Sequence, residues 1–248
     1  MEWGTFGIVH IISLIIGILL NLIVYFIASK LKGIGKTIFL LPFSLLGICA
    51  IIYNLVMWNS PFEYLPLELC SLNAIILPIV LLTKNKTLGN CLVLWSLGAL
   101  MALVMNQGAS NFLLNESPFY FYYLPHVFEF GLPIILAKLN YFELKFRYII
   151  STLLITIGLY TAVHFINIAV NNYCEANNIT DYTGKIIQVN YMYSLVPANP
   201  ALEFFYKYIP YSYWYMYAIL PIIVVYLAIV NGINALIVKY RKPTVRYI

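Results

Sequence analysis

The residues most able to do chemistry in this sequence are ionisable side chains that fall inside long apolar stretches. They are His10, Glu68, Cys70, His126, Glu129 and His164. An ionisable group in a membrane-like environment is energetically costly, so each is a functional candidate. A thiol together with an imidazole base is the composition of a nucleophilic site that forms a covalent acyl intermediate.

Two pairs of these residues have helical spacing. Cys70 and Asn73 are three residues apart, and so are His126 and Glu129, so each pair is expected to share one helix face. A carboxyl group beside an imidazole orients the ring and raises its basicity, as in a catalytic triad. Nearby prolines leave backbone carbonyls without helical donors, which favours an irregular helix that lines a cavity. These prolines are Pro66, Pro125 and Pro133.

Each candidate also has a purely structural interpretation. A free cysteine is often a small buried packing residue, and Cys70 fits that description too. His10 and Glu68 fit side chains that reach water at a membrane interface. His126, Glu129 and His164 fit hydrogen-bonded structural residues. The residues alone leave both interpretations open.

The composition indicates the class of protein that holds these residues. Of the 248 residues, 62% are hydrophobic and 9% are charged, and the mean hydropathy is +0.87. Soluble domains carry about 25% charged residues. These values exclude a soluble enzyme or a protein that binds nucleic acid. The sequence has no phosphate-binding glycine motif, so we do not expect it to bind a nucleotide. The four cysteines share no metal-ligand spacing, so we expect neither a metal nor a cofactor.

Seven apolar runs are long enough to cross a bilayer as helices. They cover residues 6–28, 38–58, 65–83, 88–106, 119–137, 148–171 and 212–238. We therefore predict an all-α fold, with residues 1–248 forming one domain of seven transmembrane helices. The long connection 173–211 is expected to cap the outer face, or else to be a surface loop with a short amphipathic helix near 200–208.

The basic residues predict the orientation of the chain. Twelve of the 14 lysines and arginines fall in alternate connections and in the tail. They are Lys30, Lys32, Lys36, Lys84, Lys86, Lys138, Lys145, Arg147, Lys239, Arg241, Lys242 and Arg246. By the positive-inside rule, the N-terminus lies outside and the C-terminus in the cytoplasm. All six ionisable candidates then lie in the outer half of the membrane.

Several short motifs resemble those of a known family. They are residues 6–11 (FGIVHI), 65–71 (LPLELCS), the pair Pro125 and His126, and residues 190–193 (NYMY). Together they resemble the bacterial YwaF-like integral membrane proteins. Those proteins are similar to the eukaryotic transmembrane protein 164, a lipid acyltransferase thought to use an intramembrane cysteine and histidine. We accordingly expect a multi-pass protein of the cell membrane, the plasma membrane of a bacterium, with membrane lipids as partners.

The resemblance implies roles for particular residues. Cys70 matches the family cysteine and His126 its fifth-span histidine. His10 matches the first-span histidine, and Asn190 with Tyr191 matches the outer NYM segment. Glu68 stands where the family often has a histidine.

The leading hypothesis is a lipid acyltransferase or acyl-ester-cleaving enzyme near the outer leaflet. Cys70 is expected to attack a fatty acyl ester, His126 to act as general base oriented by Glu129, and His10 or Asn190 to polarise the ester oxygen. Further residues are expected to bind substrate, namely Glu68, Asn73, His164, Asn190 and Tyr191. A transporter or solute-binding protein with a His126–Glu129 proton relay is the second hypothesis, and a membrane scaffold the third. The substrate and the oligomeric state stay open.

Overall fold

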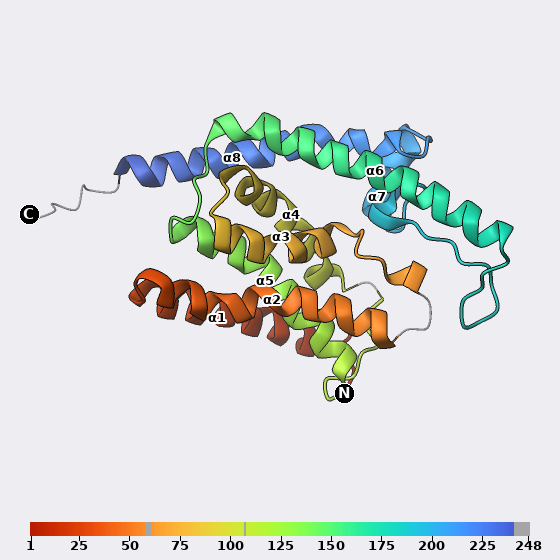
Figure 1. The fold of residues 1–248 in the computed structure, drawn as a ribbon, viewed down its shortest axis with the longest axis horizontal. Coiled ribbons are helices and arrows are strands. Elements are labelled where there is room, and N and C mark those ends of the chain that lie inside the picture. The colour runs from red at the N-terminus through yellow and green to blue at the C-terminus, as the bar shows by residue number, and fades with distance from the viewer. Residues whose placement is uncertain (58–60, 107, 241–248) are drawn as a thin grey trace, which may run out of the picture.

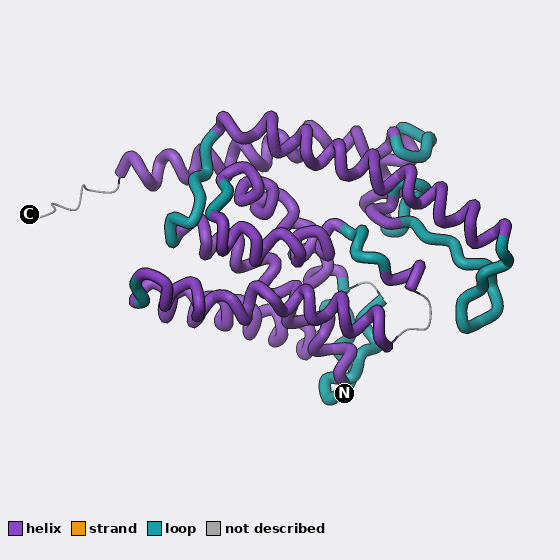
Figure 2. Tube along the Cα trace, in the orientation of Figure 1, coloured by secondary structure: helices purple, strands orange, loops and turns teal. Residues whose placement is uncertain are grey.

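The computed structural model describes residues 1–57, 61–106 and 108–240, and within these ranges the protein is all-helical, as predicted (Figures 1 and 2). Two isolated β-bridges are the only extended pairings there. The α-helices are α1 (Ile8–Lys30), α2 (Gly33–Met57), α3 (Leu69–Thr83), α4 (Lys86–Met105), α5 (Ser117–Lys138), α6 (Ile149–Ala176), α7 (Pro200–Tyr208) and α8 (Leu220–Tyr240). Short 3₁₀ helices are η1 (Pro61–Tyr64), η2 (Phe146–Tyr148), η3 (Tyr191–Tyr193) and η4 (Trp214–Ile219).

Six of the described helices are long and apolar enough to cross a membrane. They are α1, α2, α4, α5, α6 together with η2, and α8 together with η4. The expected span 65–83 forms a shorter helix, because α3 begins only at Leu69 and has 15 residues. That length corresponds to about 22 Å. Pro66 disfavours helix at the residue before it, and Glu68 at the start of α3 is still extended.

The helices form a bundle with α3 near its centre (Figure 1). Helix α3 packs against α2, α4 and α5, and α1 covers the outer side of α5. Helices α6 and α8 run along the opposite side of the bundle, where α6 packs on α4. Helix α7 lies where the sequence favours a short amphipathic helix, and it packs against η4.

Glycines let several helices approach closely. A side chain at Gly131 of α5 would overlap the amide of Asn21 on α1, and one at Gly47 of α2 would overlap Ala74 of α3. Lipid provides no hydrophobic drive between membrane helices, so their association depends on such close packing and on polar contacts. The glycines therefore set the spacing of the helices around α3 and α5.

Side-chain amides complete the hydrogen bonding of α5. Pro133 has no N–H group, so the carbonyl of Glu129, four residues earlier, has no helical donor. Asn73 of α3 donates its side-chain amide to that carbonyl oxygen at 3.0 Å. Asn21 of α1 donates to the carbonyl oxygen of Val127 at 2.9 Å. These bonds fix the middle of α5 between α1 and α3.

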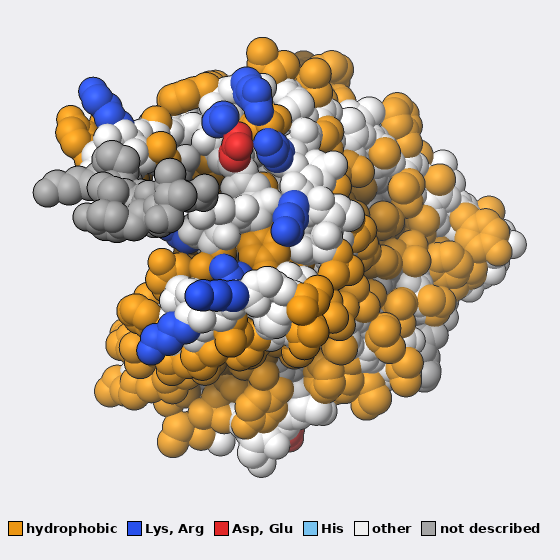
Figure 3. Space-filling model, turned by 60° about the vertical axis from the view of Figure 1, so that its left-hand side comes forward, with side chains coloured by type: hydrophobic (Ala, Val, Ile, Leu, Met, Phe, Trp, Pro, Cys, Tyr) orange, Lys and Arg blue, Asp and Glu red, His pale blue; other side chains and the backbone are white. Residues whose placement is uncertain are grey.

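Positive charge gathers at one end of the bundle (Figure 3). The described basic residues of the alternate connections lie there, at the ends of α1, α3, α5 and α8 and the starts of α2 and α4. Glu143 pairs with Lys145 at 2.6 Å and with Lys86 at 3.4 Å. The hydrogen bond from Lys145 lowers the pKa of Glu143 from its usual value. The tail residues Arg241, Lys242 and Arg246 fall outside the described residues.

Candidate functional site

A cavity of about 790 Å³ lies inside the bundle. Helices α2 to α5 line one part of it, and η1, α6, α8, η3, η4 and residues of the connecting loops line the rest. Its lining is mostly apolar, and no lysine or arginine belongs to the described lining. Ligand pockets commonly enclose about 300–1,000 Å³, so the space is sufficient for a small molecule or for part of a lipid.

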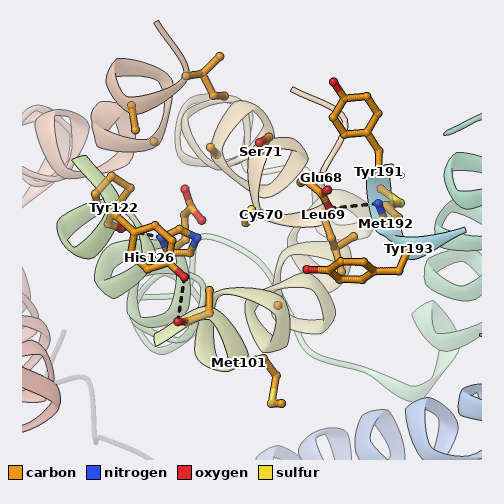
Figure 4. Close-up of a pocket in the computed structure, with 18 of the residues that line it drawn as sticks. Glu68, Leu69, Cys70, Ser71, Met101, Tyr122, His126, Tyr191, Met192 and Tyr193 are labelled. Carbon is orange, nitrogen blue, oxygen red and sulfur yellow. Dashed lines mark hydrogen bonds between the residues drawn. The ribbon is translucent and has the colours of Figure 1, made fainter. Parts of the chain in front are cut away.

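The cavity brings together five of the residues singled out from the sequence. They are Glu68, Cys70, His126, Glu129 and Tyr191. Cys70 lies in the first turn of α3 and His126 on α5 (Figure 4). Glu129 lies on α5 as well. Cys70 and His126 are both half-buried, and no hydrogen bond joins them among the described residues. The thiol and the imidazole therefore line the same cavity without a hydrogen bond between them.

The His126 ring is held by the backbone of its own helix. Its Nδ1 lies 2.6 Å from the carbonyl oxygen of Tyr122. A carbonyl only accepts hydrogen bonds, so Nδ1 carries the proton and donates it. In the neutral ring, Nε2 is then left as an acceptor, which is the state a general base requires. The Tyr122 ring packs against the imidazole with a centroid distance of 4.5 Å.

Glu129 is deeply buried, with 4% of its surface exposed. Its Oε1 lies where a side chain at Gly47 would otherwise sit. Its Oε2 has no hydrogen-bond partner, and no ion pair reaches the carboxyl among the described residues. No hydrogen bond joins Glu129 to His126, so the bond that orients the ring comes from Tyr122.

His10 lies away from the cavity, at the start of α1. Its Nδ1 accepts from the backbone N–H of Phe6 at 2.9 Å, so its Nε2 donates to the carbonyl oxygen of Leu103 at 2.8 Å. The ring is fully buried and meets Trp3 edge-on at 5.2 Å between centroids. Nε2 links α1 to α4, and Nδ1 holds the turn that precedes α1. His10 is not among the residues that line the cavity.

Three further residues predicted to bind substrate make structural hydrogen bonds and do not line the cavity. Asn73 donates to the Glu129 carbonyl. The Nδ1 of His164 lies 3.2 Å from the Ser194 hydroxyl. Asn190 closes its own loop, since its side chain donates to the carbonyl of Val196 and accepts from the backbone N–H of Leu195.

Sequence reasoning missed several cavity residues. Tyr122 and Tyr193 line the cavity beside the predicted residues (Figure 4). Tyr193 belongs to the NYMY motif, so the motif could have indicated it as a site residue. Tyr122 lies four residues before His126, so helical periodicity could have placed it on the same face. Among the described residues, no group of His, Cys, Asp or Glu side chains could hold a metal ion.

The fold and the site together define a class of protein. It is a multi-pass helical membrane protein whose mostly apolar internal cavity carries a thiol, an imidazole and three carboxyl groups, those of Glu63, Glu68 and Glu129. The chain belongs to the TMEM164 family, which it matches over residues 5–233. It matches no curated protein and no solved structure. The match confirms the resemblance seen in the sequence motifs at the level of this family.

Proposed function

We propose that this protein is a lipid acyltransferase or acyl-ester-cleaving enzyme whose reaction takes place in the cavity. The observation that carries the proposal is that Cys70 and His126 line one mostly apolar cavity within a membrane protein. A fatty acyl chain suits such a lining. A thiol nucleophile and a neutral imidazole base are the groups that acyl transfer through a thioester requires.

The first half-reaction forms a thioester on Cys70. His126 Nε2 takes the thiol proton as Sγ attacks the carbonyl carbon of a lipid acyl ester. The tetrahedral intermediate collapses with cleavage of the ester C–O bond. The imidazolium returns the proton to the departing alkoxide, which leaves as the alcohol of a deacylated lipid.

The second half-reaction releases the acyl group. A hydroxyl group of an acceptor lipid, or water, attacks the thioester carbonyl while His126 takes its proton. The C–S bond then breaks, and the proton passes to the departing sulfur. An acceptor lipid gives acyl transfer, and water gives net hydrolysis.

The proposal includes a placement in the membrane. Helix α3 would complete a seventh crossing together with residues 61–68, because non-helical backbone is tolerated at membrane depth where it lines a cavity. The basic end of the bundle would face the cytoplasm, with the N-terminus outside and the cavity mouth toward the outer leaflet. We place the chain in the YwaF-like branch of its family, in a bacterial plasma membrane.

Intact-protein mass spectrometry after incubation with native membrane lipids tests the proposal. The wild-type protein is expected to gain the mass of one acyl chain, and hydroxylamine should remove it. Cys70→Ala is expected to lose this adduct. Cys49→Ala, which makes the same change at an exposed cysteine on α2, is expected to keep it. An adduct that persists in Cys70→Ala, or its absence from the wild type after rapid acid quenching, contradicts the proposal.

A transporter or solute-binding function is the second candidate. It is favoured by the Glu129 carboxyl, which is buried, lines the cavity and leaves Oε2 without a partner. Such groups inside membranes commonly belong to proton or substrate pathways. Solute uptake that is lost in Glu129→Gln but kept in Cys70→Ala would favour this function over the enzyme.

A further inference from the structure

The segment of residues 189–195, which we call the strap, is held by side chains of α6. Asn167 accepts from the backbone N–H of Tyr191 at 3.0 Å and donates to its carbonyl oxygen at 2.9 Å. Asn171 makes the same pair of bonds to the backbone of Val189, at 2.7 and 2.9 Å. Each asparagine side chain thus bonds both the N–H and the C=O of one strap residue. In a β-sheet, a neighbouring strand would make these two bonds.

Two other elements hold the strap from further sides. Glu68, at the start of α3, accepts from the backbone N–H of Met192 at 3.0 Å (Figure 4). The Tyr215 hydroxyl of η4 donates to the carbonyl oxygen of Tyr193. The carbonyl oxygen of Ser194 accepts from the backbone N–H of Tyr213 at 2.7 Å. The position of the strap is therefore fixed from α3, α6 and η4 together.

The strap contains two consecutive residues in the left-handed region. Met192 has φ of 52° and Tyr193 has φ of 53°. Neither residue is glycine, so each conformation costs free energy through contact of its Cβ with the backbone. Such a conformation persists where the surrounding structure over-determines it, and it is often found at functional sites. The bonds to the strap provide that constraint.

The strained turn directs the Tyr193 side chain into the cavity. Figure 4 shows its ring extending from the strap into the space that Cys70 also lines. The Tyr193 hydroxyl has no hydrogen-bond partner in the described part of the chain. The hydroxyl groups of two other tyrosines that line the cavity already make hydrogen bonds. Tyr122 donates to the Ala102 carbonyl oxygen, and Tyr191 donates to the Phe62 carbonyl oxygen. Tyr193 thus offers an uncommitted donor inside an apolar space.

We propose that Tyr193 is a catalytic residue whose hydroxyl donates a hydrogen bond to the acyl carbonyl oxygen as Cys70 attacks. This inference rests on the proposed acyl-transfer function. The carbonyl oxygen gains negative charge in the tetrahedral intermediate, and a pre-positioned donor stabilises it in an apolar site. His126 is occupied as the base, and the described residues that line the cavity include no lysine or arginine to serve as the donor. The strap then acts as the rigid mount that such a donor requires.

Single-turnover acylation of Cys70 tests the inference. The rate of adduct formation is measured by mass spectrometry in liposomes of one defined phosphatidylcholine. Tyr193→Phe, which removes only the hydroxyl oxygen, is expected to slow the step about 10²- to 10³-fold. Tyr217→Phe is the matched control, because Tyr217 also lines the cavity but shares its hydroxyl with Tyr213. The rate of adduct formation in Tyr217→Phe is expected to stay within about threefold of the wild-type rate.

The outcomes separate this inference from the function on which it rests. A wild type that forms no adduct, either with this phosphatidylcholine or with native membrane lipids, overturns both. A wild type that forms the adduct, with Tyr193→Phe within about threefold of its rate, overturns only the role of Tyr193. If Tyr193→Phe melts at a lower temperature than the control, the acylation rate is measured instead in a protein with 3,5-difluorotyrosine at position 193. At a pH where that ring stays protonated it is a stronger donor, so a faster rate supports the role and an unchanged rate overturns it.

Discussion

The amide of Asn73 illustrates how single residues stabilise this membrane core. It supplies the hydrogen bond that Pro133 removes from the Glu129 carbonyl oxygen, at a site with no exposed surface. A buried carbonyl without a donor costs about 1–3 kcal/mol, because no water is available to replace the bond. The same amide thereby fixes the backbone that carries the Glu129 side chain.

Asn73→Leu should therefore reduce the free energy of unfolding by about 1–3 kcal/mol, because it preserves volume and removes the donor. Thermal or denaturant unfolding in detergent micelles measures the loss. Asn177→Leu is the control, since the exposed amide of Asn177 bonds only within its own helix end. It should change stability by less than about 0.5 kcal/mol. Equal stability of the two variants contradicts the role of Asn73.

The sequence allowed part of the site to be predicted at the level of single residues. Ionisable groups are rare in apolar helices, which makes Cys70, His126 and Glu129 candidates from the sequence alone, and all three line one cavity. The partner of each ring nitrogen was not predictable. His10 bonds to Leu103, 93 residues away, and such a contact depends on helix packing order, which periodicity does not reveal.

At the scale of elements, the packing of α5 on α1 depends on a small residue. Gly131 leaves the space that the Asn21 side chain fills, and Asn21 in turn bonds to the backbone of α5. A methyl group at position 131 would displace the Asn21 amide from both of its carbonyl acceptors, those of Gly17 and Val127. The interface would then lose close packing and hydrogen bonds together.

We expect Gly131→Ala to destabilise the protein by about 1–3 kcal/mol through overpacking. Gly158→Ala on α6 is the matched control, because no atom beyond the neighbouring residues and backbone of its own helix lies within 4 Å of the position of its added Cβ. Alanine is the better helix former, so this control should be neutral or stabilising by up to about 1 kcal/mol. Melting temperatures in one detergent compare the two, and a stable Gly131→Ala would contradict the packing argument.

The apolar runs in the sequence correspond to helices, but one helix is shorter than its run. Hydropathy does not distinguish a segment that faces lipid from one that is enclosed by protein. Leu65 and Leu67 are apolar, yet they precede α3 in non-helical backbone that packs near α6 and the strap. Pro66 was the signal for the break, and the enclosure that permits it comes from the rest of the bundle.

At the scale of the whole molecule, the charge asymmetry predicts which end of the bundle faces the cytoplasm. Lys32 lies between α1 and α2 at the basic end, whereas Lys207 lies on α7, away from that end (Figure 1). The positive-inside rule places the basic end in the cytoplasm, because basic loops are retained there during insertion.

Labelling with a membrane-impermeant maleimide tests this orientation. In a Cys49→Ala background, Lys207→Cys should react in intact cells, and Lys32→Cys should react only after the cells are permeabilised. Both positions are exposed in the structure, so neither should be blocked by burial. The background protein without an added cysteine sets the baseline. The reverse pattern would mean that the bundle is inserted the other way.

The shortness of α3 relates the proposed chemistry to the thickness of the host membrane. Cys70 lies about 20 Å along α3 from the basic end, since thirteen residues at about 1.5 Å each separate it from Thr83. A hydrocarbon core is about 30 Å thick, and α3 is enclosed by other helices, so it has no need to match the surrounding lipid. In the proposed placement, the length of α3 fixes the distance of the thiol from the cytoplasmic boundary of the membrane. If the protein acts on acyl esters as proposed, the distance that an ester group must move into the membrane to reach the thiol depends on the thickness of the lipid bilayer as well as on the protein.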